Sequence, residues 1–243
     1  MIKLKDILLE NSPPNLLIPR RIEGRVEKYV QSVIQKYIKN GSEGDLNLSG
    51  LKLTKLPSNL KNVSVGRNFS CGNTNLTSLV NAPRSVGRNF YCSYNPKLTS
   101  LVGAPSSVGG HFSCDDNNLT SLDGAPSSVG GDFYCRDNNL TSLAGAPSSV
   151  GGYFDCVNNK LTSLAGAPSS VGGYFNCSFT KLTSLVGAPS SVGEDFYCGD
   201  NKLTSLTGAP SSVGGDFWCS NNAIKFTIEQ VRAVCDVKGE III

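Results

Sequence analysis

Eight of the nine cysteines in this 243-residue chain recur at one phase of a repeat, and thiols at fixed spacing can bind metal, form disulfides or pack as small apolar groups. They stand 21 or 22 residues apart, at Cys71, Cys92, Cys114, Cys135, Cys156, Cys177, Cys198 and Cys219. Zinc sites usually take ligands from cysteines two to four residues apart, whereas no two cysteines here are closer than 16 residues. We read no signal peptide, so we expect reduced thiols in a reducing compartment. The pattern favours packing, with no metal and no cofactor.

Catalytic chemistry is not indicated by the remaining residues. His111 is the sole histidine, and Cys114 shares the phase of Phe112, so a cysteine–histidine pair would need an outward thiol that the pattern does not supply. The pair Asp115 and Asp116 is more easily explained as solvated turn residues. The Gly-Gly pairs belong to the repeat and match no phosphate-binding loop. We therefore expect a protein that is not an enzyme.

The repeat predicts the element that positions these residues. The unit reads V-G-x-x-F-x-C-x-x-N-x-L-T-S-L-x-G-A-P-S-S. Phe and Cys stand two apart, so both point to one face of an extended strand. Ala-Pro-Ser-Ser and Gly-Gly are turn material. We predict one short strand and two turns per unit. A unit of this size cannot bury its apolar residues alone, so stacked units must form a solenoid of about nine turns.

The unit resembles the leucine-rich repeat family over residues 44–224, most closely its short bacterial-effector subclass. The family pattern maps onto Val150, Phe154, Cys156, Asn159 and Leu161, with one extra residue between the first two. The resemblance implies a parallel solenoid of the α/β repeat class, in which the asparagines bond turn backbone. Those expected to do so are Asn95, Asn117, Asn138, Asn159, Asn201 and Asn222. Thr74 and Thr180 occupy the asparagine position in two units and put a continuous ladder in doubt.

The consensus sequence of the repeat is also similar to that of uncharacterised repeat proteins of large tailed bacteriophages. The opening "MIKLKDILLE" and the closing "FTIEQVRAVCDVKGEIII" are similar to the ends of such proteins. This resemblance implies a phage-encoded protein that acts inside the infected host cell or in the virion. Leu8-Leu9-Glu10 could match a short prohead-protease signal, a weak indication of processing.

The ends of the chain are expected to cap the solenoid, giving an N-terminal helical cap over 1–43 and a C-terminal helix and strand cap over 225–243. Helices are predicted over 2–9 and 22–39, the second ending at Asn40-Gly41. Thr227 and Gln230 form a capping-box sequence that opens a C-terminal helix. Ile241, Ile242 and Ile243 are predicted to form a strand that pairs locally or contacts another subunit.

The outward residues of the strands form the candidate binding face. The columns one and three residues before each cysteine vary, whereas the core columns do not, so we infer that packing does not dictate them. Aromatic residues supply large contact areas at recognition surfaces. The candidates are Tyr91, His111, Asp132, Tyr134, Tyr153, Asp155, Tyr174, Asp195, Tyr197, Asp216 and Trp218. The alternative is that aromatic pairs across strands only stabilise an exposed sheet.

Charge and hydropathy narrow the class of partner. Residues 1–61 carry a balance of +5 and residues 62–224 a balance of −2, so the repeat lacks the basic stripe that nucleic acid would need. No apolar run approaches the roughly 20 residues that span a bilayer. We expect a protein-binding module that uses the strand face. The alternatives are an assembly component that makes contact through its ends, and a reader of carbohydrate or the host surface.

Overall fold

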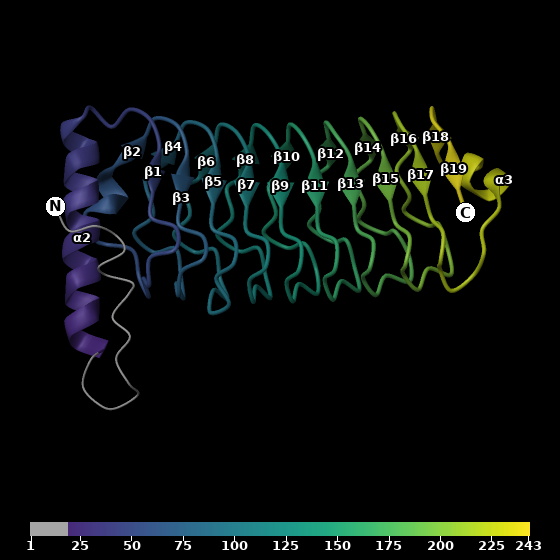
Figure 1. Cartoon of the computed structure of the whole chain (residues 1–243). Helices are drawn as coiled ribbons and strands as arrows, with labels where there is room; N and C mark the ends of the chain where they lie inside the picture. The colour runs from purple at the N-terminus through teal and green to yellow at the C-terminus, as the bar shows by residue number, and fades with distance from the viewer. Residues whose placement is uncertain (1–18) are drawn as a thin grey trace.

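The computed structural model describes residues 19–243 and shows a parallel β-solenoid of about nine turns. Helix α2 (Pro19–Lys39) lies at one end, and the short helix α3 (Ile228–Arg232) lies at the other (Figure 1). The predicted solenoid with a helix at each end is therefore confirmed. The helix predicted over 2–9 falls outside the described residues.

Each turn contributes to two sheets, so the expectation of one strand per unit is wrong. Sheet A consists of β1 (Leu46–Asn47), β3 (Phe69–Ser70), β5 (Phe90–Tyr91), β7 (Phe112–Ser113), β9 (Phe133–Tyr134), β11 (Phe154–Asp155), β13 (Phe175–Asn176), β15 (Phe196–Tyr197), β17 (Phe217–Trp218) and β19 (Ile241–Ile242). Sheet B consists of β2 (Ser64–Val65), β4 (Ser85–Val86), β6 (Ser107–Val108), β8 (Ser128–Val129), β10 (Ser149–Val150), β12 (Ser170–Val171), β14 (Ser191–Val192), β16 (Ser212–Val213) and β18 (Asp236–Val237). A Ser-Val pair is too short to show the alternation typical of a strand. It forms a strand because it pairs with the Ser-Val segments of the neighbouring turns.

The core lies between the two sheets and consists of identical residues stacked in columns. Eight phenylalanines, one from each strand of sheet A between β3 and β17, are completely buried. Neighbouring rings lie 5.1–5.8 Å apart between centroids, and most pairs are stacked. The valines of sheet B, the cysteines and the two leucines of each unit fill the remaining volume. This packing follows from a unit that cannot bury its apolar residues alone.

The predicted asparagine ladder is confirmed, and it continues through both threonines. Asn138, for example, donates to the carbonyl oxygens of Cys114, Cys135 and Arg136 at 3.0, 3.2 and 2.9 Å. Thr180 donates from its hydroxyl toward the carbonyl of Cys177 at 3.1 Å. Its hydroxyl also contacts the side chain of the next asparagine, Asn201. A threonine therefore retains part of the bonding of the amide it replaces.

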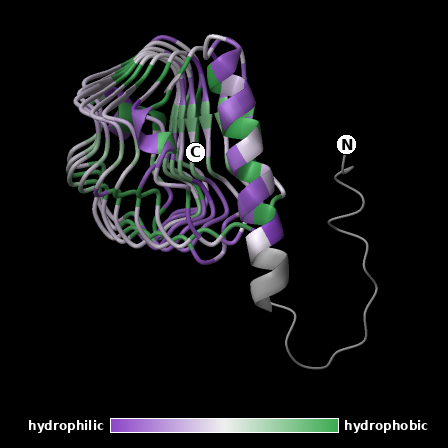
Figure 2. Cartoon of the chain, turned by 90° about the vertical axis from the view of Figure 1, so that its left-hand side faces the viewer, coloured by the Kyte–Doolittle hydropathy of each residue, from purple (hydrophilic) through white to green (hydrophobic). Residues whose placement is uncertain are grey.

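The N-terminal cap is an amphipathic helix that begins at Pro19, three residues before the predicted start. Proline is favoured in the first turn of a helix because its missing N–H has no helical partner there. Val26, Val30, Ile34 and Tyr37 are buried. Viewed from this end in Figure 2, α2 crosses the first turn with alternating hydrophilic and hydrophobic bands. The helix stops before Gly41, whose φ of 80° is left-handed.

The C-terminal cap is only partly as predicted. Thr227 and Gln230 form the expected capping box, and Val231 and Cys235 are buried. However, the apolar residues Ile228, at the start of this helix, and Val234, just after its end, are exposed. The predicted terminal strand is present as β19, which pairs with β17. Among the described helices, none is long and apolar enough to cross a membrane.

Candidate functional site

The cysteines face inward, as their phase predicted. All nine are buried and free, and burial raises the pKa of every one of these thiols. Several thiols lie against a carbonyl oxygen of the next turn, such as Cys156 against Asn176 at 3.1 Å. No group of three or more His, Cys, Asp or Glu residues that could hold a metal ion occurs within residues 19–243.

Thiol reactivity should therefore report folding. In the native protein near pH 8 we expect the seven repeat cysteines from Cys71 to Cys198 to resist alkylation, because the reactive thiolate is disfavoured and the sulfur is inaccessible. Cys219 and Cys235, whose pKa values rise only to about 11, should react first. All nine should react in denaturant. Rapid native labelling of Cys135 or Cys156, read by mass spectrometry, would contradict this burial.

The candidate site is the outward surface of sheet A, here called the variable face. It consists of the residues three before, one before and one after each repeat cysteine. The residues three before each cysteine have a structural role. The inference that packing does not dictate this column is therefore wrong. Its side chains accept the backbone N–H of the same column in the next turn, for example Asp132 from Tyr153 at 2.9 Å and Asp195 from Asp216 at 2.8 Å. The further acceptors are Asn68, Asn89, His111 and Asp216.

Tyr153 and Tyr174 interrupt this acceptor ladder. Among the described residues, no hydrogen bond satisfies the N–H of Tyr174 or of Asp195, which follow the two tyrosines by one turn. The two rings instead stack on each other, 4.2 Å apart between centroids and 15° from parallel. The Tyr153 ring lies across Gly173, where an added Cβ would come within 2.2 Å of a ring carbon. These two positions therefore depart from the rule that the rest of the column follows.

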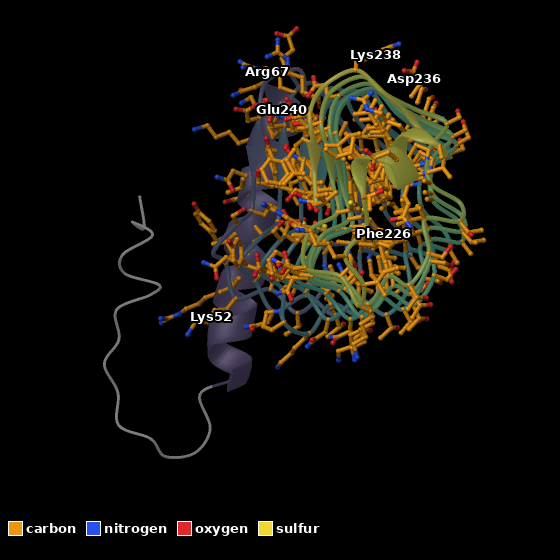
Figure 3. The ribbon with its side chains drawn as sticks, turned by 90° about the vertical axis from the view of Figure 1, so that its right-hand side faces the viewer. Lys52, Arg67, Phe226, Asp236, Lys238 and Glu240 are labelled. Atoms are coloured by element: carbon orange, nitrogen blue, oxygen red, sulfur yellow. The ribbon has the colours of Figure 1, made fainter. Side chains whose placement is uncertain are left out.

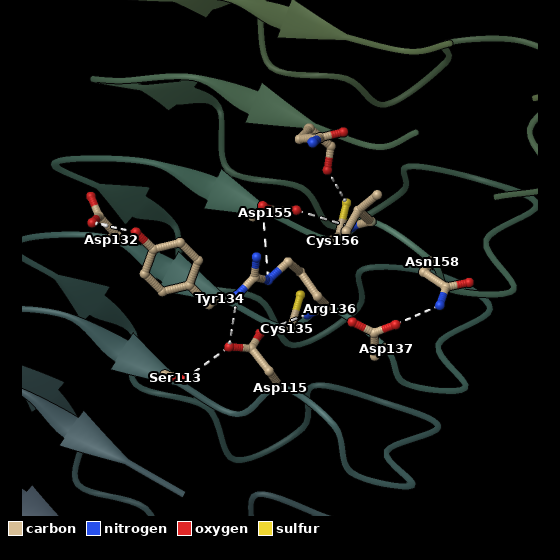
Figure 4. A network of polar contacts seen from close by, with 12 residues as sticks. Ser113, Asp115, Asp132, Tyr134, Cys135, Arg136, Asp137, Asp155, Cys156 and Asn158 are labelled. Atoms are coloured by element: carbon tan, nitrogen blue, oxygen red, sulfur yellow. Dashed lines mark hydrogen bonds and ion pairs between the residues drawn. The ribbon is translucent and has the colours of Figure 1, made fainter. Parts of the chain in front are cut away.

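A charged cluster surrounds Arg136, which Figure 4 shows with Asp115, Asp155 and Tyr134. Arg136 extends between two carboxylates of adjacent turns, 3.6 Å from Asp115 and 4.0 Å from Asp155. Asp155 also accepts the Tyr174 hydroxyl at 3.1 Å. Burial raises the pKa of both carboxyl groups, because desolvation outweighs the attraction of Arg136. Partial burial and the neighbouring Asp155 carboxylate also raise the pKa of the Tyr174 phenol.

A second group of contacts joins His111, Asp132 and Tyr134. The Tyr134 hydroxyl donates to the Asp132 carboxylate at 2.7 Å, and the Arg136 guanidinium lies over the Tyr134 ring, 5.4 Å from its centroid. The Asp132 carboxylate also lies 2.9 Å from His111 Nδ1, the nitrogen that accepts the Asp132 backbone N–H. These contacts hold the aromatic side chains of the face in fixed positions, which lowers the ordering cost of binding.

The remaining candidates lie on the outward side of sheet A, as expected, but one of them is not accessible. Asp155 is only 4 % exposed, so it supports neighbouring side chains and does not itself present a contact surface. Tyr91 and Trp218 are the most exposed aromatics of the face, at 36 % and 38 %. Tyr197 contacts both Tyr174 and Trp218, each at 5.9 Å between centroids, which makes the aromatic strip continuous over four turns. His111, Asp195 and Asp216 are half-buried.

Two residues of the site were not among the predicted candidates, Arg136 and Asp115. The interpretation of Asp115 as a solvated turn residue is wrong, because it is only 6 % exposed. Both stand one residue after a cysteine, in a column that also varies from unit to unit, and that variation was the available signal. Ile242 was placed in the terminal strand, but its register beside Trp218 adds it to the outward aromatic column.

Comparisons with known proteins leave the site to be interpreted from its own geometry. No protein-family model matches the chain, and no curated protein is significantly similar to it.

Proposed function

We propose that the chain is a non-enzymatic binding module whose variable face recognises a basic, extended segment of a partner protein. The observation that carries this proposal is the tyrosine pair. Every other residue in that column between Asn68 and Asp216 supplies an acceptor to the fold, whereas Tyr153 and Tyr174 do not. Positions that break a local structural rule are where function is expected.

The charge of the face supports a basic partner. The variable face carries five aspartates and a single arginine, Arg136. Asp115 and Asp155 are buried against that arginine, so the carboxylates available to a partner are those of Asp132, Asp195 and Asp216. The aromatic strip runs among these carboxylates and is held by them, as the Tyr197 hydroxyl is by Asp195 at 2.7 Å. Lysine and arginine side chains can place their charge near the carboxylates and their apolar stems against the ring edges.

The ring geometry favours a peptide over a sugar. Sugars stack on the open faces of aromatic rings, but the stacking of Tyr153 on Tyr174 covers one face of each ring. Both side chains are half-buried, so part of each remains accessible to solvent. A peptide can use these accessible parts and the neighbouring carboxylates together. Carbohydrate binding therefore remains the weaker of the two proposals.

The double variant Y153N/Y174N tests the proposal without disturbing the fold. Asparagine at Asn68 and Asn89 already serves the acceptor ladder, so the substitutions should restore the two missing backbone bonds. We expect unchanged or higher thermal stability and at least about tenfold weaker binding, since loss of an aromatic anchor typically costs 2 kcal/mol or more, as an order of magnitude.

Binding is measured by fluorescence polarisation with extended peptides rich in lysine and arginine, selected on a peptide array. Peptides of the same length with the charges reversed are the specificity control. The matched variant V80S/V102S removes two exposed apolar side chains outside the variable face and should bind like the wild type. Equal binding by Y153N/Y174N, or a preference of the wild type for acidic peptides, would overturn the proposal.

A further inference from the structure

The charge of this protein is polarised along the solenoid axis. In a solenoid, position in the sequence is position along the axis, so charge counts over consecutive segments map onto the two ends. Residues 24–67 hold eight Lys/Arg and three Asp/Glu, a balance of +5. Residues 68–193 hold six of each, and residues 194–243 hold four Lys/Arg and seven Asp/Glu, a balance of −3. The described chain is therefore a rod with a basic N-terminal end and an acidic C-terminal end.

The C-terminal end is an incomplete cap. A terminal cap normally presents a polar outer surface, because its function is to cover the core. Here Ile224, Ile228 and Val234 are 42 %, 42 % and 45 % exposed on and beside α3. Strands β18 and β19 are also the last strands of their sheets, so each has one edge without a neighbouring strand. Figure 3 shows this end, with α3 flanked by the charged residues Asp236, Lys238 and Glu240.

The N-terminal end has matching properties. A hollow of about 180 Å³ lies between α2 and residues 52–57, and the apolar residues Val26, Leu53 and Pro57 contribute to its lining. Lys52 and Lys55 also line it, and both are exposed. The outer surface of α2 adds further basic side chains, Lys28, Lys36 and Lys39. Glu27 is the one acidic residue of the lining, so this end combines a partly apolar depression with net positive charge.

We propose that the C-terminal end of one copy binds the N-terminal end of a second copy, so that the rods associate head to tail. The exposed isoleucines and valine of the cap would be buried against the apolar hollow, and the acidic end would face the basic end. Because the two surfaces differ, each copy keeps one free end of each kind, and the contact generates open chains and not closed dimers. The variable face does not take part, so this inference is independent of the proposed function.

Charge reversal at each end separately provides the test. The variant K52E/K55E reverses the N-terminal end, and D236K/E240K reverses the C-terminal end. Mass is followed by sedimentation velocity of the full chain in a concentration series at low ionic strength. We expect wild-type mass to rise beyond that of a dimer. Each variant alone should associate at least about tenfold more weakly, because the reversed pair at one end then faces a pair of the same sign at the other end.

Mixing the two variants gives the decisive result. The reversed N-terminal end of one is complementary to the reversed C-terminal end of the other, so an equimolar mixture should recover the association that each lacks. The variant I228S should weaken association at unchanged charge. Circular dichroism checks that every variant is folded. A wild type that stays monomeric, association that stops at a dimer, or a mixture that stays monomeric would each overturn the head-to-tail contact.

Discussion

Replacing Asn138 with alanine is expected to lower the free energy of unfolding by about 3–5 kcal/mol, an estimate built from the cost of leaving buried polar groups unpaired. The Asn138 amide donates to three carbonyl oxygens, and its Oδ1 accepts the N–H of Leu119 at 3.0 Å. These backbone groups belong to the turn of Asn138 itself and to the preceding turn. Alanine would leave them without this partner inside the solenoid, where only 7 % of Asn138 is exposed. Urea denaturation followed by circular dichroism measures the loss.

The variant N138T is the matched control. Thr74 and Thr180 hold this position in two other turns, and each donates to the carbonyl of its own cysteine and contacts the next asparagine. Asn138 is likewise followed by an asparagine, Asn159, one turn later. The threonine variant should therefore lose roughly 1–2 kcal/mol, because it keeps a donor but not the acceptor for Leu119. Equal stability of N138A and the wild type would contradict the structural role of the ladder.

Replacing Gly172 with alanine is expected to lower the free energy of unfolding by about 3 kcal/mol or more, the upper range for forcing atoms into a packed site. An added Cβ would lie 2.1 Å from the carbonyl oxygen of Gly151 in the preceding turn. The obstacle is backbone, which cannot move aside as a flexible side chain can. Relieving it would separate two turns of sheet B in the middle of the solenoid, so hydrogen bonds on both sides of the site would lengthen.

The control for this prediction is Gly24→Ala in α2. No atom lies within 4 Å of a Cβ added at Gly24, and alanine is the better helix former by about 1 kcal/mol. We expect this variant to be as stable as the wild type or slightly more stable. The thermal unfolding temperature should then fall for Gly172→Ala and stay the same or rise slightly for Gly24→Ala. A Gly172→Ala protein with wild-type stability would show that the turns are not in contact at this column.

The repeat itself was sufficient to predict the solenoid. Phenylalanine and cysteine two residues apart must share a face of a strand, and a unit of this size must stack to bury them. The resemblance stated for the repeat implied that Asn138 and its equivalents bond backbone, and the capping-box sequence at Thr227 predicted the start of a helix. These features depend on residues close together in the chain, or on the period alone, and both can be read from the sequence.

The candidate site required the tertiary structure. The role of Tyr153 depends on its contact with Tyr174, 21 residues away, on which its ring stacks. It also depends on the space above Gly173 that the ring occupies. The burial of Asp155 follows in the same way from Arg136 and Tyr174 in the adjacent turns.

By itself, therefore, the sequence determined the period of this protein, the inward residues of each turn and the helical caps, because those follow from local geometry and the need to bury apolar area. The tertiary structure alone decided which outward residues the fold uses, because neighbouring turns meet there at hydrogen-bond distance. It also decided that the Ser-Val segment of each unit forms a second strand, and that the first glycine after this strand has no room for a side chain.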